Sequence, residues 1–274
     1  MDERDDLHTN EAPDPALGGR MDGGAMVTVD GSSPRRARYG VDAPYLLPVA
    51  GVVSLANVVV AAMSRSVGPV IAACAVLVSV GLALHTSRRG KFLVWTELLD
   101  GLQLKGDERI LDLGCGRGAV LLATAKRLNR GHAIGVDIWN RFDQSGNSVD
   151  SNRRNAEAEG VSERVAPLTA NMMALPFHAG TFDVVVSNVA IHNIKDQIGR
   201  TAAVDEAVRV LRPGGRLLLA DLSGTRAYER RLVGLGMAEV GRRSLGWRMW
   251  WGGPWRATYL VTATKPENGN KPAA

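Results

Sequence analysis

The sequence of 274 residues contains only two cysteines and five histidines, and no long run of lysine and arginine. Cys74 lies in a hydrophobic stretch and Cys115 in a glycine-rich loop, so we expect no disulfide framework. The histidines are scattered without metal-ligand spacing, and we predict no metal site. The net charge is +5 at pH 7, but the basic residues do not form the continuous tract that follows a phosphate backbone. We therefore predict no nucleic-acid partner.

Charge is almost absent from residues 46–63 and 67–84, which are about eighteen residues long each. That length is close to the minimum for a helix that spans a bilayer, and neither stretch has the polar face of a surface helix. The short break between them contains Gly68-Pro69 and suits a tight turn. We expect two transmembrane helices within residues 45–86. The alternative is a buried helical hairpin that packs on a soluble domain.

Basic residues flank the two hydrophobic stretches on their outer sides. They are Arg35, Arg36 and Arg38 before the first stretch, and Arg88, Arg89 and Lys91 after the second. The connector holds only Arg65, so the positive-inside rule places both flanks in the cytoplasm. We expect a protein of the bacterial inner or plasma membrane whose catalytic domain is cytoplasmic. Residues 1–44 and 267–274 are polar and are predicted to be disordered tails.

Residues 92–266 alternate between short apolar strands and helices and are predicted to form one domain. The expected strands are residues 109–113, 133–137, 164–169, 182–187 and 216–220, with two late strands around 239–243 and 257–264. The expected helices are residues 117–128, 151–160 and 201–211, the last closed by Pro213-Gly214-Gly215. This alternation is typical of an α/β fold with a doubly wound sheet.

The most informative segment is the first strand, which runs into Gly114, Gly116 and Gly118 and then into a helix. Glycines at such a turn allow the backbone to approach a ligand closely. Asp137 ends the next strand, nineteen residues after Gly118, where a carboxylate can accept hydrogen bonds from ribose hydroxyls. The spacing differs from the G-x-G-x-x-G of nicotinamide dehydrogenases, which counts against that class of enzyme.

Five segments in succession resemble the motifs of class I S-adenosylmethionine (SAM) dependent methyltransferases of the small-molecule type. They are LDLGCGRG, GVD, NMMALPF, FDVVVSNVAIHNI and VLRPGGRLLLAD. The resemblance covers about the last two thirds of the chain and implies a Rossmann-like, doubly wound sheet of seven strands with SAM as cofactor. It is specific for the family and does not identify a substrate.

The resemblance also implies roles for individual residues. The glycine loop, with Cys115 filling space inside it, lies beneath the methionine part of SAM, and Asp112 contacts its amino-acid end. Asp137 binds the ribose hydroxyls, and Ile138 packs against adenine. The cofactor-binding residues so predicted are Asp112, Gly114, Cys115, Gly116, Gly118, Asp137, Ile138, Asn171, Met172 and Asn188. Asn171 stands where the family usually has Asp, although its carbonyl oxygen can still accept a hydrogen bond from the adenine amino group.

The candidate catalytic residue is His192, which follows the fourth strand in the segment that faces the methyl group in the family. Histidine changes its charge near neutral pH, so it is suited to remove a proton from a hydroxyl acceptor. A structural role at the rim of the pocket is an equal alternative. The Asn/Asp-Pro-Pro-Tyr/Phe tetrapeptide of amino-group methyltransferases is absent after this strand, which disfavours nucleobase and protein-amide substrates.

Four of the six tryptophans lie in the segment GWRMWWGGPWR, at positions 247, 250, 251 and 255. Their indoles either fill a packed hairpin or lie at a membrane interface, where tryptophan and arginine partition well. We therefore predict a methyltransferase at the cytoplasmic membrane face that acts on a small, apolar, amphipathic or lipid-like substrate. A catalytically inactive SAM-binding scaffold is the alternative, and the sequence makes no prediction of oligomeric state.

Overall fold

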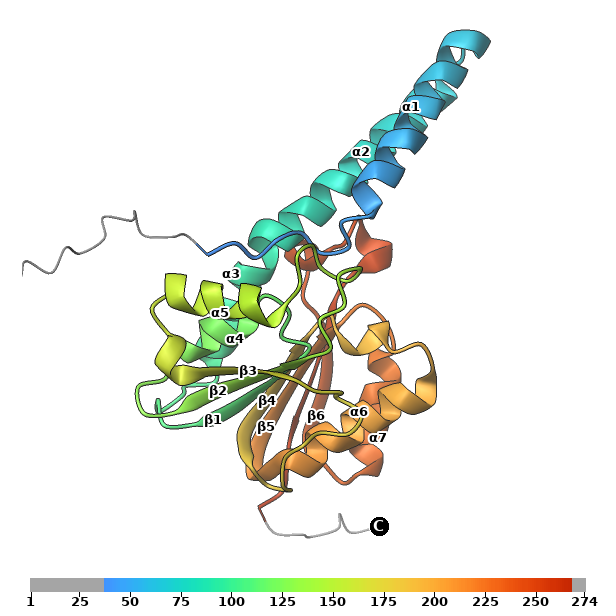
Figure 1. Cartoon of the computed structure of the whole chain (residues 1–274). Coiled ribbons are helices and arrows are strands. Elements are labelled where there is room, and N and C mark those ends of the chain that lie inside the picture. The colour runs from blue at the N-terminus through green and yellow to red at the C-terminus, as the bar shows by residue number, and fades with distance from the viewer. Residues whose placement is uncertain (1–36, 268–274) are drawn as a thin grey trace, which may run out of the picture. The chain divides into compact units, whose positions relative to one another are not determined.

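The structure, a computed structural model, describes residues 37–267 of the chain. These residues belong to the larger of two compact units, Pro34–Ala274. Along this part of the chain two long apolar helices come first, and an α/β domain follows them (Figure 1).

A single seven-stranded sheet forms the centre of the α/β domain, in the order β3-β2-β1-β4-β5-β7-β6. The strands are β1 (Arg109–Leu113), β2 (His132–Asp137), β3 (Val165–Thr169), β4 (Phe182–Asn188), β5 (Leu211–Asp221), β6 (Ala238–Ser244) and β7 (Tyr259–Thr264). Neighbouring strands from β3 to β5 run parallel, and β7 pairs antiparallel with both β5 and β6. The sheet is therefore mixed, with one reversed strand near its β6 edge.

Helices cover both faces of the sheet. Successive residues of a strand point to opposite faces, so the apolar strands present side chains to both faces. Ile110 and Val184 belong to one buried cluster, together with Trp95 of α3. Their chain neighbours Leu111 and Val185 belong to the other. One face carries α3 (Lys91–Gly101), α4 (Ala119–Ala125) and α5 (Val149–Ala158), and the opposite face carries α6 (Gln197–Val210) and α7 (Thr225–Gly234) (Figure 1). The predicted doubly wound arrangement with seven strands is confirmed.

The two apolar stretches form the helical hairpin α1 (Leu46–Ser64) and α2 (Gly68–His85), which lie side by side (Figure 1). Both are long and apolar enough to cross a membrane by length and composition. Large apolar side chains of the hairpin are exposed, among them Val52 at 70% and Met63 at 81%. Only 6% of the apolar window of α1 is buried, which contradicts the alternative of a hairpin buried on a soluble domain.

No linker separates the hairpin from the domain, since α2 continues through a π-helical turn (Thr86–Gly90) into α3. This turn packs directly on the tryptophan-rich segment: the Thr86 hydroxyl donates to the Trp250 carbonyl at 2.7 Å. A Cβ atom placed on Gly90 would lie 1.8 Å from the backbone carbonyl oxygen of Arg248. Glycine at this position therefore permits the close backbone approach.

The structure differs from the sequence-based expectations in four places. The predicted disordered tail is wrong for residues 37–44, which lie in place against the domain, whereas residues 1–36 and 268–274 lie outside the described part. Helix α6 starts earlier than predicted, at Gln197, and Pro213-Gly214-Gly215 falls within the bounds of β5. The helices α3 and α7 were not predicted. Helix α3 continues α2 through the polar π-helical turn, and helix α7 consists mostly of polar residues.

Candidate functional site

The glycine loop between β1 and α4 is held in a conformation that side chains disfavour. Gly114, Gly116 and Gly118 have φ angles of +72°, +49° and +91°. A Cβ atom on Gly114 would lie 2.2 Å from the Cβ of Ala190, and one on Gly116 would lie 2.7 Å from the Gln144 side-chain oxygen. Because these glycines have no side chain, the backbone of the loop is open to a ligand.

A cavity of about 380 Å³ lies over this loop, a size within the range of small-molecule sites. Most of its lining comes from the carboxyl ends of β1, β2 and β4 and from the loops after β1 to β4, where ligands bind in open α/β sheets. The predicted cofactor-binding residues that line it are Asp112, Gly114, Cys115, Gly116, Asp137, Ile138, Asn171, Met172 and Asn188. The exception is Gly118, which lies behind the loop as the N-cap of α4.

Asp137 organises the loop around its carboxylate. One oxygen accepts the backbone N–H of Gly116 at 2.8 Å, and the other accepts the N–H of Trp139 at 2.6 Å and the side-chain amide of Asn147 at 3.3 Å. The side-chain oxygen of Asn147 is buried without a hydrogen-bond partner and borders the same cavity. An unpartnered buried acceptor and a carboxylate with free lone pairs fit a ligand that carries hydroxyl donors.

Asp112 is the most deeply buried acid of the cavity wall. Burial, with a contribution from the negative charge of Asp137, raises the pKa of this carboxyl group from its ordinary 3.8 to about 8. The folded chain therefore keeps a proton on Asp112 between these two values, where the unfolded chain has lost it. The stability associated with this group is greatest below the unfolded value and is lost as the pH rises through about 8.

Replacement of Asp112 by asparagine removes the buried charge at nearly constant shape. We expect the ligand-free Asp112→Asn variant to melt about 5 °C above the native chain near pH 9, and the gap to shrink toward pH 5. The same variant is expected to bind SAM more weakly, since an amide cannot ionise to pair with a cationic group, as the Asp112 carboxyl group can. Thermal unfolding at several pH values measures the first effect. An equal difference in melting temperature at all pH values would contradict the buried charge as its cause.

The residues predicted for the adenine side, Ile138, Asn171 and Met172, all line this cavity. Asn171 accepts the N–H of Met173 at 2.9 Å through its side-chain oxygen, so that oxygen already has one donor. Ile138 is 66% exposed, which leaves its side chain available to pack on a flat ring. Burial, assisted by the nearby acids Asp112 and Asp137, raises the pKa of the Cys115 thiol well above its usual value. A protonated thiol is a poor nucleophile, in agreement with a space-filling role for Cys115.

Asn188 is the last residue of β4 and His192 follows the strand, and each is held by a buried partner. The indole N–H of Trp95 donates to the side-chain oxygen of Asn188 at 2.8 Å. An indole only donates, so the amide NH₂ of Asn188 faces away from Trp95. The Nδ1 atom of His192 lies 2.6 Å from a carboxylate oxygen of the buried Asp221, a close contact without the alignment of a hydrogen bond. The His192 backbone N–H donates to the other oxygen of the same carboxylate at 2.9 Å.

His192 does not border the cavity over the glycine loop. It lines a second cavity, of about 540 Å³, between the hairpin and the domain. The two cavities share the lining residues Asp42, Asp143, Asn188, Val189 and Asn193. His192 was predicted to follow the fourth strand and to face the methyl group. In the structure its side chain lines the second cavity, which adjoins the cavity over the glycine loop (below, the cofactor cavity).

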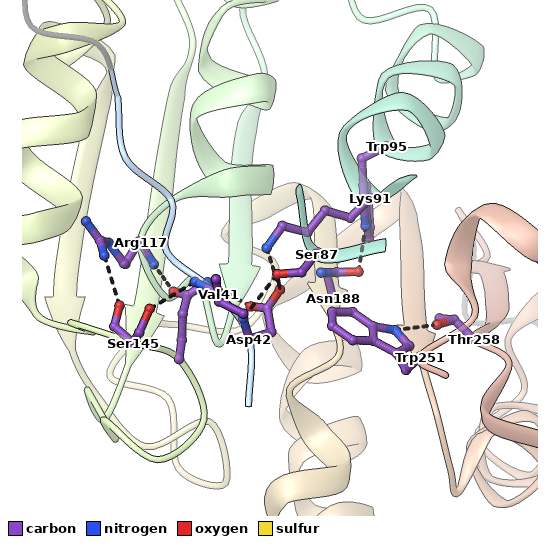
Figure 2. A network of polar contacts seen from close by, with 11 residues as sticks. Val41, Asp42, Ser87, Lys91, Trp95, Arg117, Ser145, Asn188, Trp251 and Thr258 are labelled. Atoms are coloured by element: carbon purple, nitrogen blue, oxygen red, sulfur yellow. Dashed lines mark hydrogen bonds and ion pairs between the residues drawn. The ribbon is translucent and has the colours of Figure 1, made fainter. Parts of the chain in front are cut away.

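A polar network that the sequence did not reveal connects the hairpin to the glycine loop (Figure 2). Asp42 pairs with Lys91 at 2.7 Å and accepts hydrogen bonds from Ser87 and from the side-chain amide of Gln144. Gln144 in turn accepts the backbone N–H of Arg117 at 2.8 Å. Lys91 is only 2% exposed, so this cation is neutralised by Asp42 and does not contribute to the cytoplasmic positive charge predicted for it.

Comparisons with known proteins agree with this site. Residues 110–215 match the model of a family described as a methyltransferase domain. The chain is 34% identical over 131 residues to the ubiquinone/menaquinone biosynthesis C-methyltransferase UbiE of Ruegeria sp. (strain TM1040), covering 47% of this chain and 49% of the relative. It is 37% identical over 129 residues to the 27-O-demethylrifamycin SV methyltransferase of Amycolatopsis mediterranei (strain S699), covering 46% and 43%.

Solved structures show the same fold. Geranyl diphosphate methyltransferase in complex with SAM matches with a TM-score of 0.52 at 18% identity, covering 66% of this chain and 87% of its own. The cyclase SpnF matches with a TM-score of 0.52 at 20% identity, covering 63% and 81%. At identities this low the likeness shows the fold alone. A cyclase among these neighbours illustrates that the fold by itself does not assign methyl transfer.

Residues 110–215, which lie within the seven-stranded α/β domain, are thus similar to a methyltransferase domain. The comparisons support a SAM-dependent methyltransferase as the class of enzyme, with S-adenosyl-L-methionine as its cofactor. The chain spans about half the length of the curated relatives that it matches. The activity and substrate of the whole chain are therefore treated as a proposal.

Proposed function

We propose that this chain is a membrane-associated methyltransferase that transfers a methyl group from SAM to a small apolar or amphipathic acceptor at the cytoplasmic membrane face. The observation that carries this proposal is the position of the cofactor-type cavity, which adjoins an exposed apolar hairpin through shared lining residues. Exposed apolar surface of this extent is typical of a membrane or partner interface. The exposed Arg88 and Arg89 beside the hairpin favour the cytoplasmic orientation.

The residues over the glycine loop fit the cofactor by the chemistry of their donors and acceptors. Asp137 and Asn147 offer acceptors to ribose hydroxyls, and Ile138 offers an apolar surface to adenine. Asp112 offers a carboxyl group to the amino-acid end, whose positive charge would favour its ionised form. When bound, SAM supplies an activated methyl group for in-line displacement. The protein then contributes positioning, exclusion of water and removal of a proton from the acceptor.

His192 is the residue that we propose for the proton step. Its Nδ1 side is occupied by the close contact with Asp221, which leaves Nε2 as the nitrogen available to an acceptor. The buried Asp221 carboxylate, which also accepts the His192 backbone N–H, holds the imidazole in this position. The acceptor hydroxyl would give its proton to Nε2 of His192 and its oxygen would take the methyl group, while the bond from sulfur to the methyl carbon breaks and S-adenosylhomocysteine leaves.

The relatives indicate an acceptor class. Two are named for quinone biosynthesis, the UbiE protein of Ruegeria and a demethylmenaquinone methyltransferase of Lactiplantibacillus plantarum (strain ATCC BAA-793 / NCIMB 8826 / WCFS1), 32% identical over 123 residues, covering 44% of this chain and 48% of that relative. A quinol has ring hydroxyls and an apolar body, which matches an acceptor dissolved in a membrane. We include quinol-like and other hydroxylated lipid-like molecules in the proposal.

Transfer of a labelled methyl group tests this function. The full chain in phosphatidylcholine vesicles that contain a bacterial lipid extract is incubated with methyl-labelled SAM, and the label in the organic phase is counted. We expect label to appear there with the native chain and to be absent with Asp137→Ala. A native chain that binds SAM but labels nothing would favour the alternative, a membrane scaffold that binds SAM without turnover.

The tryptophan-rich segment divides into buried and exposed indoles. Trp251 is 8% exposed and donates to the Thr258 hydroxyl at 3.1 Å, whereas Trp255 is 75% exposed. The indole of Trp251 therefore packs inside the protein, as one of the two interpretations of this segment expects. Only the exposed indoles are available to a membrane interface. Trp255 borders the same cavity as the hairpin, so its surroundings are apolar on one side.

Trp255 is expected to contact lipid in the full chain. In vesicles of bromine-labelled phosphatidylcholine, Trp255→Phe should remove a substantial share of the quenching of tryptophan fluorescence. Trp139→Phe, which changes a half-buried indole beside β2, is the matched control and should leave the quenched share nearly unchanged. Equal quenching in both variants would place Trp255 in water and contradict the interface.

A further inference from the structure

The cavity between the hairpin and the domain has one apolar end and one polar end. Its apolar wall consists of Leu46, Leu47, Val49, Ala50 and Val53 of α1, with Ala75, Val76, Val80, Ala83 and Leu84 of α2. Its polar end holds the side chains of Asn188, His192, Asn193 and Asp143. With a volume of about 540 Å³ it has the size and the mixture of linings that small-molecule sites show.

The polar end of this cavity is the end that adjoins the cofactor cavity. Asp143, Asn188, Val189 and Asn193 line both cavities. The NH₂ group of Asn188 faces away from Trp95 and has no hydrogen bond within the part of the chain that the structure describes. His192, held by Asp221, lies in the same wall. A donor and a proton acceptor thus meet at the junction of the two cavities.

The apolar end extends along the hairpin. Val53 lies seven residues beyond Leu46, which corresponds to about 10 Å along a helix that rises about 1.5 Å per residue. The facing residues of α2 belong to the last ten or so before the π-helical turn, so both helices contribute their domain-side ends. Val49 and Val53 line the cavity and are 56% and 41% exposed, so its apolar wall belongs to the exposed surface of the hairpin and the cavity is not an isolated core void.

We infer that this cavity is the acceptor site, and that the hairpin forms its wall as well as associating with the membrane. The occupant is a membrane-dissolved molecule with a hydroxylated ring and a hydrocarbon chain. Its ring lies against Asn188 and His192, and its chain lies between α1 and α2. This inference rests on the proposed function and adds that the acceptor reaches the methyl group laterally from the bilayer, along the hairpin.

Small residues in the wall allow the site to be filled by substitution. Ala50 of α1 and Ala83 of α2 line the cavity and are half-buried. Ala56, on α1, is exposed and does not line it. Ala50→Phe and Ala83→Phe therefore place a ring in the proposed site, and Ala56→Phe places the same ring on the outer surface of the hairpin.

The probe is decyl-naphthoquinol, kept reduced without oxygen, added to the full chain in phosphatidylcholine vesicles and followed by the change in tryptophan fluorescence, for which Trp251 in the cavity wall is a reporter. We expect Ala50→Phe and Ala83→Phe to weaken probe binding by about tenfold or more, and Ala56→Phe to leave it within about twofold. All three variants should bind SAM as the native chain does, which verifies the fold of the domain.

Two results separate failure of this inference from failure of the proposed function. If the native chain transfers a labelled methyl group, and Ala50→Phe and Ala83→Phe bind the probe as Ala56→Phe does, the acceptor lies elsewhere and the inference is overturned. If the native chain does not bind SAM, the proposed function fails first, and the inference that rests on it fails with it. Loss of probe binding and of methyl transfer in the two cavity variants alone supports the acceptor site.

Discussion

Replacement of His192 by alanine is expected to slow methyl transfer by about a hundredfold or more while SAM affinity remains that of the native chain. The reason is geometric: His192 lies outside the cofactor cavity, in the wall of the adjoining cavity, and Asp221 holds it at 2.6 Å. The loss should therefore fall on kcat for the acceptor reaction. Calorimetric SAM binding beside labelled-methyl turnover measures the two quantities separately.

A conservative variant and a positioning variant sharpen this test. His192→Gln keeps a polar side chain but cannot take up a proton, so it should be as slow as His192→Ala. Asp221→Asn keeps the imidazole but removes the carboxylate that contacts its Nδ1 atom and positions the ring, so we expect an intermediate loss of kcat. Turnover of His192→Gln within about twofold of the native chain would assign His192 a structural role at the rim of the pocket.

Replacement of Asp137 by alanine is expected to weaken SAM binding by about a hundredfold or more, because a carboxylate that accepts several hydrogen bonds is lost. The backbone N–H groups of Gly116 and Trp139, which donate hydrogen bonds to Asp137 in the native chain, would lose their acceptor. The ribose hydroxyls would lose the same acceptor. Isothermal calorimetry of the full chain in detergent measures the affinity.

Asp150→Ala is the matched control for this effect, since Asp150 is an exposed acid on α5 and does not line the cofactor cavity. It should bind SAM as the native chain does. Thermal unfolding verifies that Asp137→Ala is folded. SAM affinity of a folded Asp137→Ala chain within about threefold of the native value would mean that this carboxylate shapes the loop without touching the ligand.

The sheet and its glycine loop were predictable because their signals are local. An apolar strand followed directly by glycines is visible in adjacent residues of the sequence, as at Leu113 and Gly114. The structure gives Gly114 the positive φ angle that glycine permits. The resemblance supplied the number of strands and the doubly wound arrangement, and the structure agrees. The strand order and the reversed β7 were not predicted, because no single segment of the sequence encodes them.

The contacts that tie the hairpin to the site were not predictable, because they join residues far apart in the sequence. Lys91 looked like one of several flanking cations, yet it is buried against Asp42, a residue of the presumed tail. The displacement of His192 from the cofactor cavity likewise depends on Asp221, almost thirty residues away. Nothing in the local pattern around either residue indicates its partner.

The central claim is that the cavity over the glycine loop binds SAM. The most direct test is a calorimetric titration of the full native chain in detergent with SAM, with S-adenosylhomocysteine and with NAD. The account predicts that SAM and S-adenosylhomocysteine each saturate one site and that NAD releases no heat of binding. A folded chain that binds neither SAM nor S-adenosylhomocysteine, or that binds NAD in their place, would contradict it.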